Sequence, residues 1–255
     1  MNNIPEFSIV TVCFNSEKTI KTTIESVLQQ KYKDYEYIIV DGASKDSTMD
    51  VVKSYETKFE GRLRYISEPD KGIYDAFNKG IRMSRGKYVW IVNSDDYIEP
   101  NALEELSSIT SQYTFENAPI ISAGMNLCEE KSVTTFFGSA EKAAIAYKKD
   151  GVCSPHPSTL VPLHIYNKIG VYDDRFKISG DKEWLHRAYK MKVPFVFVDK
   201  VVTNMMIGGI STKPNFKKKY KDTVLYLRIN YKNPFVFLYK LIYWLYQFYV
   251  KYHKH

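Results

Sequence analysis

The chain has 255 residues, 44% of them hydrophobic, and a formal net charge of +7 at pH 7. This length suits one large α/β domain, or one domain with a short appendage, and the apolar content excludes a disordered chain. The three cysteines, Cys13, Cys128 and Cys153, are spaced neither as a metal knuckle nor as a redox pair. We therefore expect reduced thiols and a cytosolic protein, whose first apolar run begins a strand and is not a signal peptide.

The positive charge is concentrated at the C-terminus. Residues 217–255 contain nine Lys or Arg and one acid, Asp222, which gives this segment a net charge of +8. The other 216 residues carry a net charge of −1. An anionic partner is therefore expected to meet the C-terminal segment.

The first hundred residues alternate between predicted strands and helices. The strands are continuous apolar runs, which is typical of a parallel sheet covered by helices on both faces. Ligands bind such sheets at the carboxyl ends of the strands. The predicted strands are 7–14, 36–40, 62–66 and 87–92, and the predicted helices are 17–30, 46–57 and 72–83.

The pattern from about residue 110 to 210 is less regular. We expect this half to cover the carboxyl edge of the sheet and to supply an acceptor pocket. Short strands are predicted over 119–123, 132–137, 158–161 and 195–198, with helices over 163–169 and 181–191.

An acidic cluster, Asn93-Ser94-Asp95-Asp96, follows the fourth predicted strand directly. Carboxylate oxygens suit Mg²⁺ or Mn²⁺, which bind through one or two protein carboxylates together with substrate phosphates. A divalent ion there would neutralise the charge of a leaving diphosphate. The same residue types also form ordinary turns and helix N-caps, so the cluster alone leaves both interpretations open.

Other well-known chemical signatures are absent from the sequence. It has neither a GxxxxGK[ST] phosphate loop nor a GxGxxG motif after the first strand. It also lacks a GxSxG nucleophile elbow and an HExxH zinc motif. P-loop enzymes, dinucleotide-binding enzymes and these hydrolase classes are therefore disfavoured.

Four segments, taken in order, resemble the family 2 glycosyltransferases. They are FSIVTVCFN (7–15), IIVDGASKDST (38–48), SEPDKGIYDAFNKGI (67–81) and NSDD (93–96). The third is most similar to the branch that builds bacterial surface polysaccharides, such as colanic acid and O-antigen. The resemblance covers about residues 7–212. It implies a GT-A fold, which is an α/β fold with a Rossmann-like, mostly parallel sheet and helices on both faces.

The resemblance also implies which residues contact the nucleotide-sugar donor and the metal. Asp96 is expected to bind Mn²⁺ or Mg²⁺, with Asp95 either ligating the ion or contacting the ribose. Asn93 stands where the family's Asp-x-Asp motif begins with Asp, and Gly42 stands where a second acid is common. The expected donor-binding residues are Thr11, Phe14, Asn15, Asp41, Asp70, Asp75, Asn78, Lys79, Ser94 and Asp95.

Asp181 is the predicted general base of an inverting transfer, in which a carboxylate accepts the proton of the acceptor hydroxyl. It lies at the start of a predicted helix, whose N-terminus favours an ionised side chain, although it could also serve only as the N-cap. Glu183 is the reserve candidate. The resemblance also implies a substrate-side role for His156, although a lone histidine can be purely structural. Gly209 and Ser211 belong to the segment Gly208-Gly209-Ile210-Ser211, which could close over the donor diphosphate with its backbone N–H groups or form a simple turn.

The C-terminal segment has an unusual aromatic run. Eight of the 17 residues from 234 to 250 are aromatic, and Lys240 is the only charged residue among them. The run is short for a membrane span, and Tyr and Trp favour the membrane–water boundary. With flanking lysines that attract anionic lipid, it predicts a helix lying on the membrane. Packing on the catalytic domain, a dimer interface and a true span remain alternatives.

These observations together predict an inverting, metal-dependent hexosyltransferase. Residues 1–212 form the GT-A domain, with a nucleotide-sugar half (1–110) and an acceptor half (111–212), and residues 213–255 form the membrane-association tail. The donor is predicted to be a UDP-sugar and the acceptor a lipid-linked saccharide of O-antigen, capsule or exopolysaccharide, at the inner face of the cytoplasmic membrane. Nucleic acid is not expected as a partner, and an oligomer is left open. The alternative is a catalytically silent sugar-nucleotide-binding or scaffold subunit.

Overall fold

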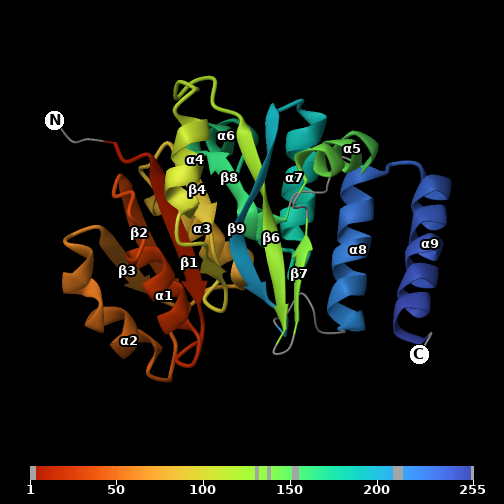
Figure 1. Ribbon diagram of the computed structural model, residues 1–255. Coiled ribbons are helices and arrows are strands. Elements are labelled where there is room, and N and C mark those ends of the chain that lie inside the picture. The colour runs from red at the N-terminus through yellow and green to blue at the C-terminus, as the bar shows by residue number, and fades with distance from the viewer. Residues whose placement is uncertain (1–3, 130–131, 137–138, 151–154, 209–214, 254–255) are drawn as a thin grey trace.

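The computed structural model describes residues 4–129, 132–136, 139–150, 155–208 and 215–253. Within these residues the chain forms a mixed nine-stranded sheet between two layers of helices, followed by a helical hairpin (Figure 1). The order of strands along the sheet is β3-β2-β1-β4-β8-β6-β9-β5, and β7 pairs with β6.

The N-terminal half of the sheet is parallel, as the continuous apolar runs predicted. β1 pairs with β2 and β4, and β2 pairs with β3, all in parallel. Every residue of β1, β2 and β4 is buried, because helices cover both faces. These strands are β1 (Phe7–Cys13), β2 (Tyr35–Asp41), β3 (Leu63–Ser67) and β4 (Tyr88–Ile91).

The C-terminal half of the sheet is mostly antiparallel. β8 pairs antiparallel with β4 and β6, β5 with β9, and β7 with β6, whereas β6 and β9 run parallel. β6 and β9 are longer than expected. The exposed Asp199-Lys200 pair interrupts the apolar pattern of β9 without ending the strand. These strands are β5 (Tyr97–Ile98), β6 (Ile120–Glu129), β7 (Ser132–Phe136), β8 (Thr159–Pro162) and β9 (Phe195–Met206).

The helices divide between the two faces of the sheet. Helices α1, α2 and α4 pack in one hydrophobic core, and α3, α6 and α7 pack in the other. Helix α4 was not predicted, because its single apolar turn is followed by serines and threonines. The helices of the sheet region are α1 (Ile20–Leu28), α2 (Thr48–Ser54), α3 (Ile73–Met83), α4 (Ala102–Thr110), α5 (Ala140–Asp150), α6 (Leu163–Ile169) and α7 (Gly180–Lys190), with short 3-10 turns η1 (Glu56–Phe59) and η2 (His156–Ser158).

The C-terminal segment is a hairpin of two helices, α8 (Phe216–Asn230) and α9 (Pro234–His253). Helix α8 lies against the body of the protein and α9 lies outermost (Figure 1). Tyr226 of α8 bonds through its hydroxyl to Nδ1 of His186 on α7, at 2.8 Å. Among the described residues, none of the helices combines the length and the apolarity that crossing a membrane requires. The α/β fold class, the mostly parallel N-terminal sheet and the helical tail are thus confirmed.

Candidate active site

The carboxyl ends of the four parallel strands gather the predicted polar residues at one edge of the sheet. The segment after β1 presents Phe14, whose side chain is 60% exposed. The backbone N–H of Asn15 donates to Ser44 Oγ at 2.8 Å, and its side-chain oxygen accepts from the Lys45 N–H at 2.9 Å. The loops after β1 and β2 are therefore tied together, and the Phe14 ring is available as a flat apolar surface.

Asp41 lies beneath this surface. It is fully buried, and its carboxylate accepts hydrogen bonds from the hydroxyl of Ser67 at 2.6 Å and from the backbone N–H of Ser44 at 3.0 Å. The Ser44 hydroxyl donates to it as well. In this structure Asp41 thus holds the ends of β2 and β3 and the following loop in place.

Asp70 fills the space beside Gly42. A Cβ on Gly42 would lie 2.5 Å from Asp70 Oδ2 and 3.3 Å from the Phe14 ring. The other oxygen of Asp70 accepts the N–H of Gly72 at 2.8 Å. The carboxylate of Asp70 therefore occupies the space that the side chain of an acid at position 42 would take, where this chain has glycine.

Asp75 and Lys79 brace the loop that carries Asp70. Asp75 accepts the backbone N–H of Lys71 at 3.0 Å. The Lys79 ammonium donates to the Pro69 carbonyl at 2.7 Å and pairs with Glu68 at 2.9 Å. Both side chains thus border the site by holding the shape of the 68–72 loop.

Two of the predicted donor residues do not reach the edge. Thr11 lies inside β1, fully buried, and its hydroxyl accepts from the Tyr37 hydroxyl at 3.0 Å. Asn78 is buried, and both ends of its amide bond to the backbone of Tyr172, at 2.8 and 2.9 Å. These two side chains support the site from within the core.

The acidic cluster lies at the end of β4. Asp96 is 1% exposed and accepts the Met206 N–H at 3.0 Å and the Asn93 amide at 3.1 Å. Burial and the neighbouring Asp95 raise the pKa of Asp96 to about 7. Asp95 is only partly buried, so it is the more accessible of the two carboxylates. Ser94 is buried and bonds to Ser16 Oγ at 2.9 Å, which joins this loop to the one after β1.

The donor set of this cluster fits a hard divalent ion. Burial raises the pKa of Asp95 too, and a nearby cation would compensate both carboxylates. The buried Oδ1 of Asn93 accepts no hydrogen bond from the residues described here. In that part of the chain, however, His, Cys, Asp and Glu side chains do not gather in groups of three or more suited to a metal. Mg²⁺ and Mn²⁺ sites of few protein ligands are completed by substrate phosphates and water.

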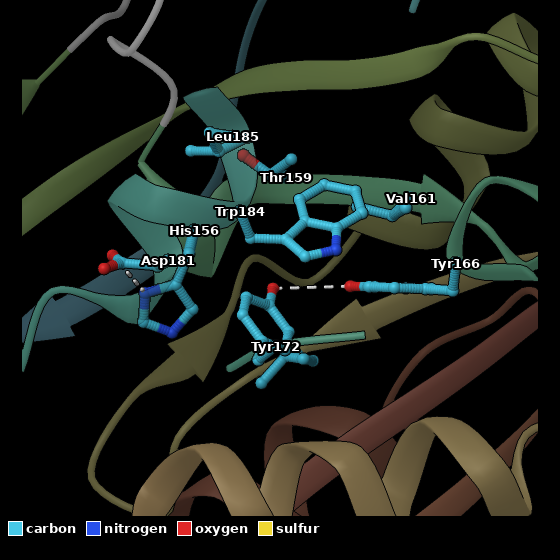
Figure 2. A pocket seen from close by; sticks show the side chains of 9 residues that line it. His156, Thr159, Val161, Tyr166, Tyr172, Asp181, Trp184 and Leu185 are labelled. Atoms are coloured by element: carbon cyan, nitrogen blue, oxygen red, sulfur yellow. Dashed lines mark hydrogen bonds and ion pairs between the residues drawn. The ribbon is translucent and has the colours of Figure 1, made fainter. Parts of the chain in front are cut away.

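Asp181 stands in the first turn of α7, beside His156, whose charge also acts on Asp95 and Asp96 of the acidic cluster. Asp181 Oδ1 accepts the Lys182 N–H at 2.8 Å and lies 3.2 Å from the Tyr74 hydroxyl. His156 Nδ1 lies 3.7 Å from Asp181 Oδ2, the contact drawn in Figure 2. Burial opposes ionisation of Asp181, but His156, the Lys182 N–H and the Tyr74 hydroxyl outweigh it and lower its pKa.

A small cavity of about 10 Å³ adjoins Asp181 and His156, which is room for about one water molecule. Tyr172 and Tyr166, whose hydroxyls lie 3.3 Å apart, and Trp184 form its aromatic wall (Figure 2).

Glu183, the reserve base, faces the core. Its side chain is 4% exposed, and one oxygen lies 2.8 Å from Nε of Arg187. This leaves Asp181 as the accessible carboxylate at the start of α7. Gly209 and Ser211 lie outside the described residues.

Sequence reasoning missed two residues of this region. Tyr74 sits inside the third resembled segment, but as an apolar-looking helical residue it gave no separate signal. Asp222 binds the loop before Asp181. The only feature of the sequence that could have drawn attention to Asp222 is that it is the single acid in a basic segment.

Comparisons with known proteins bear on this site. Residues 8–115 match the sequence model of Glycosyl transferase family 2. Over 205 residues the chain is 29% identical to the uncharacterized glycosyltransferase RT0329 of Rickettsia typhi, covering 78% of this chain and 62% of that protein. The chain therefore spans less than two thirds of this relative.

Two solved structures share the fold. S. aureus TarS 1-349 in complex with UDP-GlcNAc is similar with a TM-score of 0.69 and 18% identity, over 97% of this chain and 73% of that one. The mannosyltransferase PcManGT from Pyrobaculum calidifontis, in complex with GDP-Man and Mn²⁺, is similar with a TM-score of 0.62 and 16% identity, over 91% and 66%. At these identities the likeness establishes the fold alone.

Proposed function

We propose that this chain is a family 2 glycosyltransferase, and that it is an inverting transferase that uses a UDP-sugar and a lipid-linked saccharide acceptor. The observation that carries the proposal is the placement of two acidic sites on one sheet edge. Asp95 and Asp96 follow β4, and Asp181 begins α7, and His156 is close enough to both sites for its charge to lower the pKa of all three carboxyl groups.

Asp181 is the proposed base. The acceptor hydroxyl attacks the anomeric carbon of the donor and forms the new glycosidic bond, while the bond from that carbon to the nucleotide diphosphate breaks. The hydroxyl proton passes to Asp181, whose lowered pKa keeps it ionised at neutral pH before each transfer. A carboxylate on the acceptor side, opposite the leaving group, leads to inversion.

The donor is proposed to lie over the edge formed by Phe14, Asp70 and Asp95. The exposed Phe14 ring can stack on the nucleotide base, and the neighbouring carboxylate of Asp70 can accept hydrogen bonds from base or ribose. A UDP donor is supported by the fold shared with TarS, which was solved with UDP-GlcNAc. The GDP-Man complex of PcManGT keeps a guanine donor as the alternative.

Asp95 and Asp96 would hold Mn²⁺ or Mg²⁺. When bound, the ion stabilises the negative charge that the leaving diphosphate acquires. The raised pKa of both carboxylates supports this assignment, as does the buried Asn93 Oδ1, which accepts no hydrogen bond from the part of the chain that the structure describes. PcManGT, with the same fold, was solved with Mn²⁺.

We test the base with Asp181→Asn and, as a matched control, Asp174→Asn on the preceding loop. The first variant should bind the nucleotide-sugar like the wild type and lose transfer by about 10²- to 10⁴-fold, the usual contribution of a general base. The control should keep wild-type rates. Near-normal transfer by Asp181→Asn would show that another group is the base. Donor binding without transfer in the wild type, with every acceptor, would favour the silent subunit.

The lipid-linked acceptor is supported by the outer face of α9. Seven large apolar or aromatic side chains lie on this face and are 53–82% exposed. The opposite face of the helix packs on α8 through Trp244 and Phe248, which contact Phe216. We call the exposed set the outer face of α9: Phe235, Leu238, Tyr239, Ile242, Tyr243, Tyr246 and Tyr249.

The residues on and beside the outer face of α9 favour an anionic membrane surface as its binding partner. Four of the seven residues are tyrosines, which prefer the membrane–water boundary. Lys217, Lys218 and Lys221 on the adjoining α8 are exposed. Apolar burial combined with a lysine cluster is the pattern of peripheral binding to anionic lipid.

Vesicle co-sedimentation tests this surface. Binding to phosphatidylglycerol vesicles should exceed binding to phosphatidylcholine vesicles and weaken with salt. Tyr246→Asp on the outer face should reduce it at least severalfold more than Gln247→Asp, which adds the same charge on the flank of α9. Equal effects of the two variants would reject the outer face as the contact. A lipid-independent dimer broken by Tyr246→Asp would identify a second copy as the occupant.

A further inference from the structure

Asp222 is a buried carboxylate that neither the fold class nor the proposed chemistry explains. It lies on α8, is 2% exposed and is the only acid among residues 217–255. It accepts hydrogen bonds from three successive backbone N–H groups. Lys177 donates at 3.1 Å to each oxygen, Ile178 at 2.6 Å and Ser179 at 2.9 Å.

These N–H groups are the partners that allow the charge to be buried. The ion pairs found among the described residues do not include Asp222. Successive N–H groups of a turn form a concavity that binds anions, and here the anion is a side chain from a distant helix. Hydrogen bonds to an ionised acceptor are among the strongest in proteins. Asp222 therefore fixes the conformation of the 177–179 loop.

The 177–179 loop leads directly into α7, and Asp181 follows two residues later. Ile178 is held at both of its backbone polar groups, since its N–H donates to Asp222 and its carbonyl accepts the Tyr74 hydroxyl at 2.7 Å. The next residue but one, Gly180, packs on the Tyr74 ring so closely that a Cβ would lie 2.8 Å from it. The start of α7 is thus clamped between α3 and α8.

We propose that Asp222 is a positioning residue for the base, and that α8 is part of the catalytic unit. This inference rests on the proposed role of Asp181. The boundary predicted at residue 212, between a catalytic domain and a tail, then does not separate a catalytic part from a membrane-binding part. Helix α8 carries Asp222 on the side of the active site, and through Phe216 and Phe248 it carries α9 on the other.

The test compares Asp222→Asn with Asn230→Ala. Asp222→Asn keeps the size of the side chain but removes the charge and places an NH₂ group against N–H donors. Asn230→Ala removes another contact between α8 and α7, the 2.7 Å bond to Lys190, which is distant in sequence from the base loop. We expect kcat to fall about 10- to 100-fold in Asp222→Asn, as for small displacements of a catalytic group. Donor affinity should stay within about twofold, because the donor edge is built by other loops.

A second readout does not depend on activity. Amide hydrogen exchange of wild-type residues 177–179 should be slow for a loop, and Asp222→Asn should accelerate it while Asn230→Ala does not. This wild-type measurement decides the matter even if Asp222→Asn fails to fold, since fast exchange at these amides would overturn the proposal. Unchanged kcat in a folded Asp222→Asn would also overturn it. An inactive wild type with protected amides would count against the proposed function but not against the clamp.

Discussion

Tyr74→Phe removes one hydroxyl beside the proposed base and leaves the aromatic ring. That hydroxyl donates to the Ile178 carbonyl at 2.7 Å and lies 3.2 Å from Asp181 Oδ1. The ring is 4% exposed and packs against Phe77 and Tyr172, and phenylalanine preserves these contacts. The variant therefore isolates the hydrogen bonds from the packing.

The hydroxyl has one proton, which it donates to the Ile178 carbonyl and shares with the more distant Asp181 carboxylate. A hydrogen bond to a charged group contributes about 1.5–3 kcal/mol, and the 3.2 Å distance to Asp181 favours the lower end. Since about 1.4 kcal/mol corresponds to tenfold in rate, kcat should fall roughly tenfold. Leaving the Ile178 carbonyl without its donor costs a further ~1–3 kcal/mol of stability. For a chain of this size that lowers Tm by roughly 2–4 °C per kcal/mol.

Steady-state kinetics and thermal unfolding measure both effects, with Tyr55→Phe as the control. Tyr55 is also buried and donates to a carboxylate, Glu25, at 2.6 Å, but it lies in the opposite core. The control should lose stability and keep kcat. The pH profile of kcat/KM also tests the direction in which the pKa of Asp181 changes. Tyr74 helps to lower the pKa of Asp181, so in Tyr74→Phe the acid limb of kcat/KM should move to higher pH. Equal kcat and an unmoved acid limb in the two variants would refute the reasoning.

Three further outcomes follow from the same geometry. In the wild type at saturating Mn²⁺, kcat/KM should stay flat as pH falls from 8 to about 5 and decline only below, because the lowered pKa of Asp181 keeps the base ionised above its ordinary carboxyl range; a half-point near pH 7 would point to Asp96 instead, since burial and Asp95 raise its pKa to about 7. Asp95→Asn should raise the Mn²⁺ concentration needed for half-maximal activity by about tenfold or more, because it removes about one charged interaction with the ion. An unchanged metal requirement would exclude Asp95 as a ligand. Gly80→Ala should lower the free energy of unfolding by ~1–3 kcal/mol, because its Cβ would lie 2.3 Å from Val10 Cγ1; an unchanged melting temperature would show that α3 moves away from β1 without cost.

The N-terminal half could be predicted from the sequence because each apolar run ends in its own polar loop. The runs at 7–14 and 36–40 became β1 and β2, and the helix expected over 163–169 is α6. β9 was predicted too short, since Asp199 and Lys200 look like the end of a strand although they point to solvent within one. Local pattern decides where strands begin, but pairing with β6 decides how far this one extends.

The sequence predicted which loops form the site better than it predicted the directions in which their side chains point. The resemblance to the family predicted that Asp95, Asp96 and Asp181 belong to one site, but it did not indicate that the side chains of Thr11 and Asn78 are buried in the core. A side chain's direction depends on which neighbours hold it, as Tyr172 holds Asn78. Tyr74 and Asp222 were missed for the same reason, because their partners lie 104 and 44 residues away in the sequence.

The most direct test of the account is nucleotide release by the purified chain with UDP-, GDP- and dTDP-sugars, first with Mn²⁺ and then with EDTA. We expect slow turnover with a UDP-sugar, which EDTA abolishes and which Asp181→Asn lacks. Turnover that persists undiminished in EDTA would contradict the metal site. The absence of both nucleotide binding and turnover with every donor would contradict the proposed activity itself.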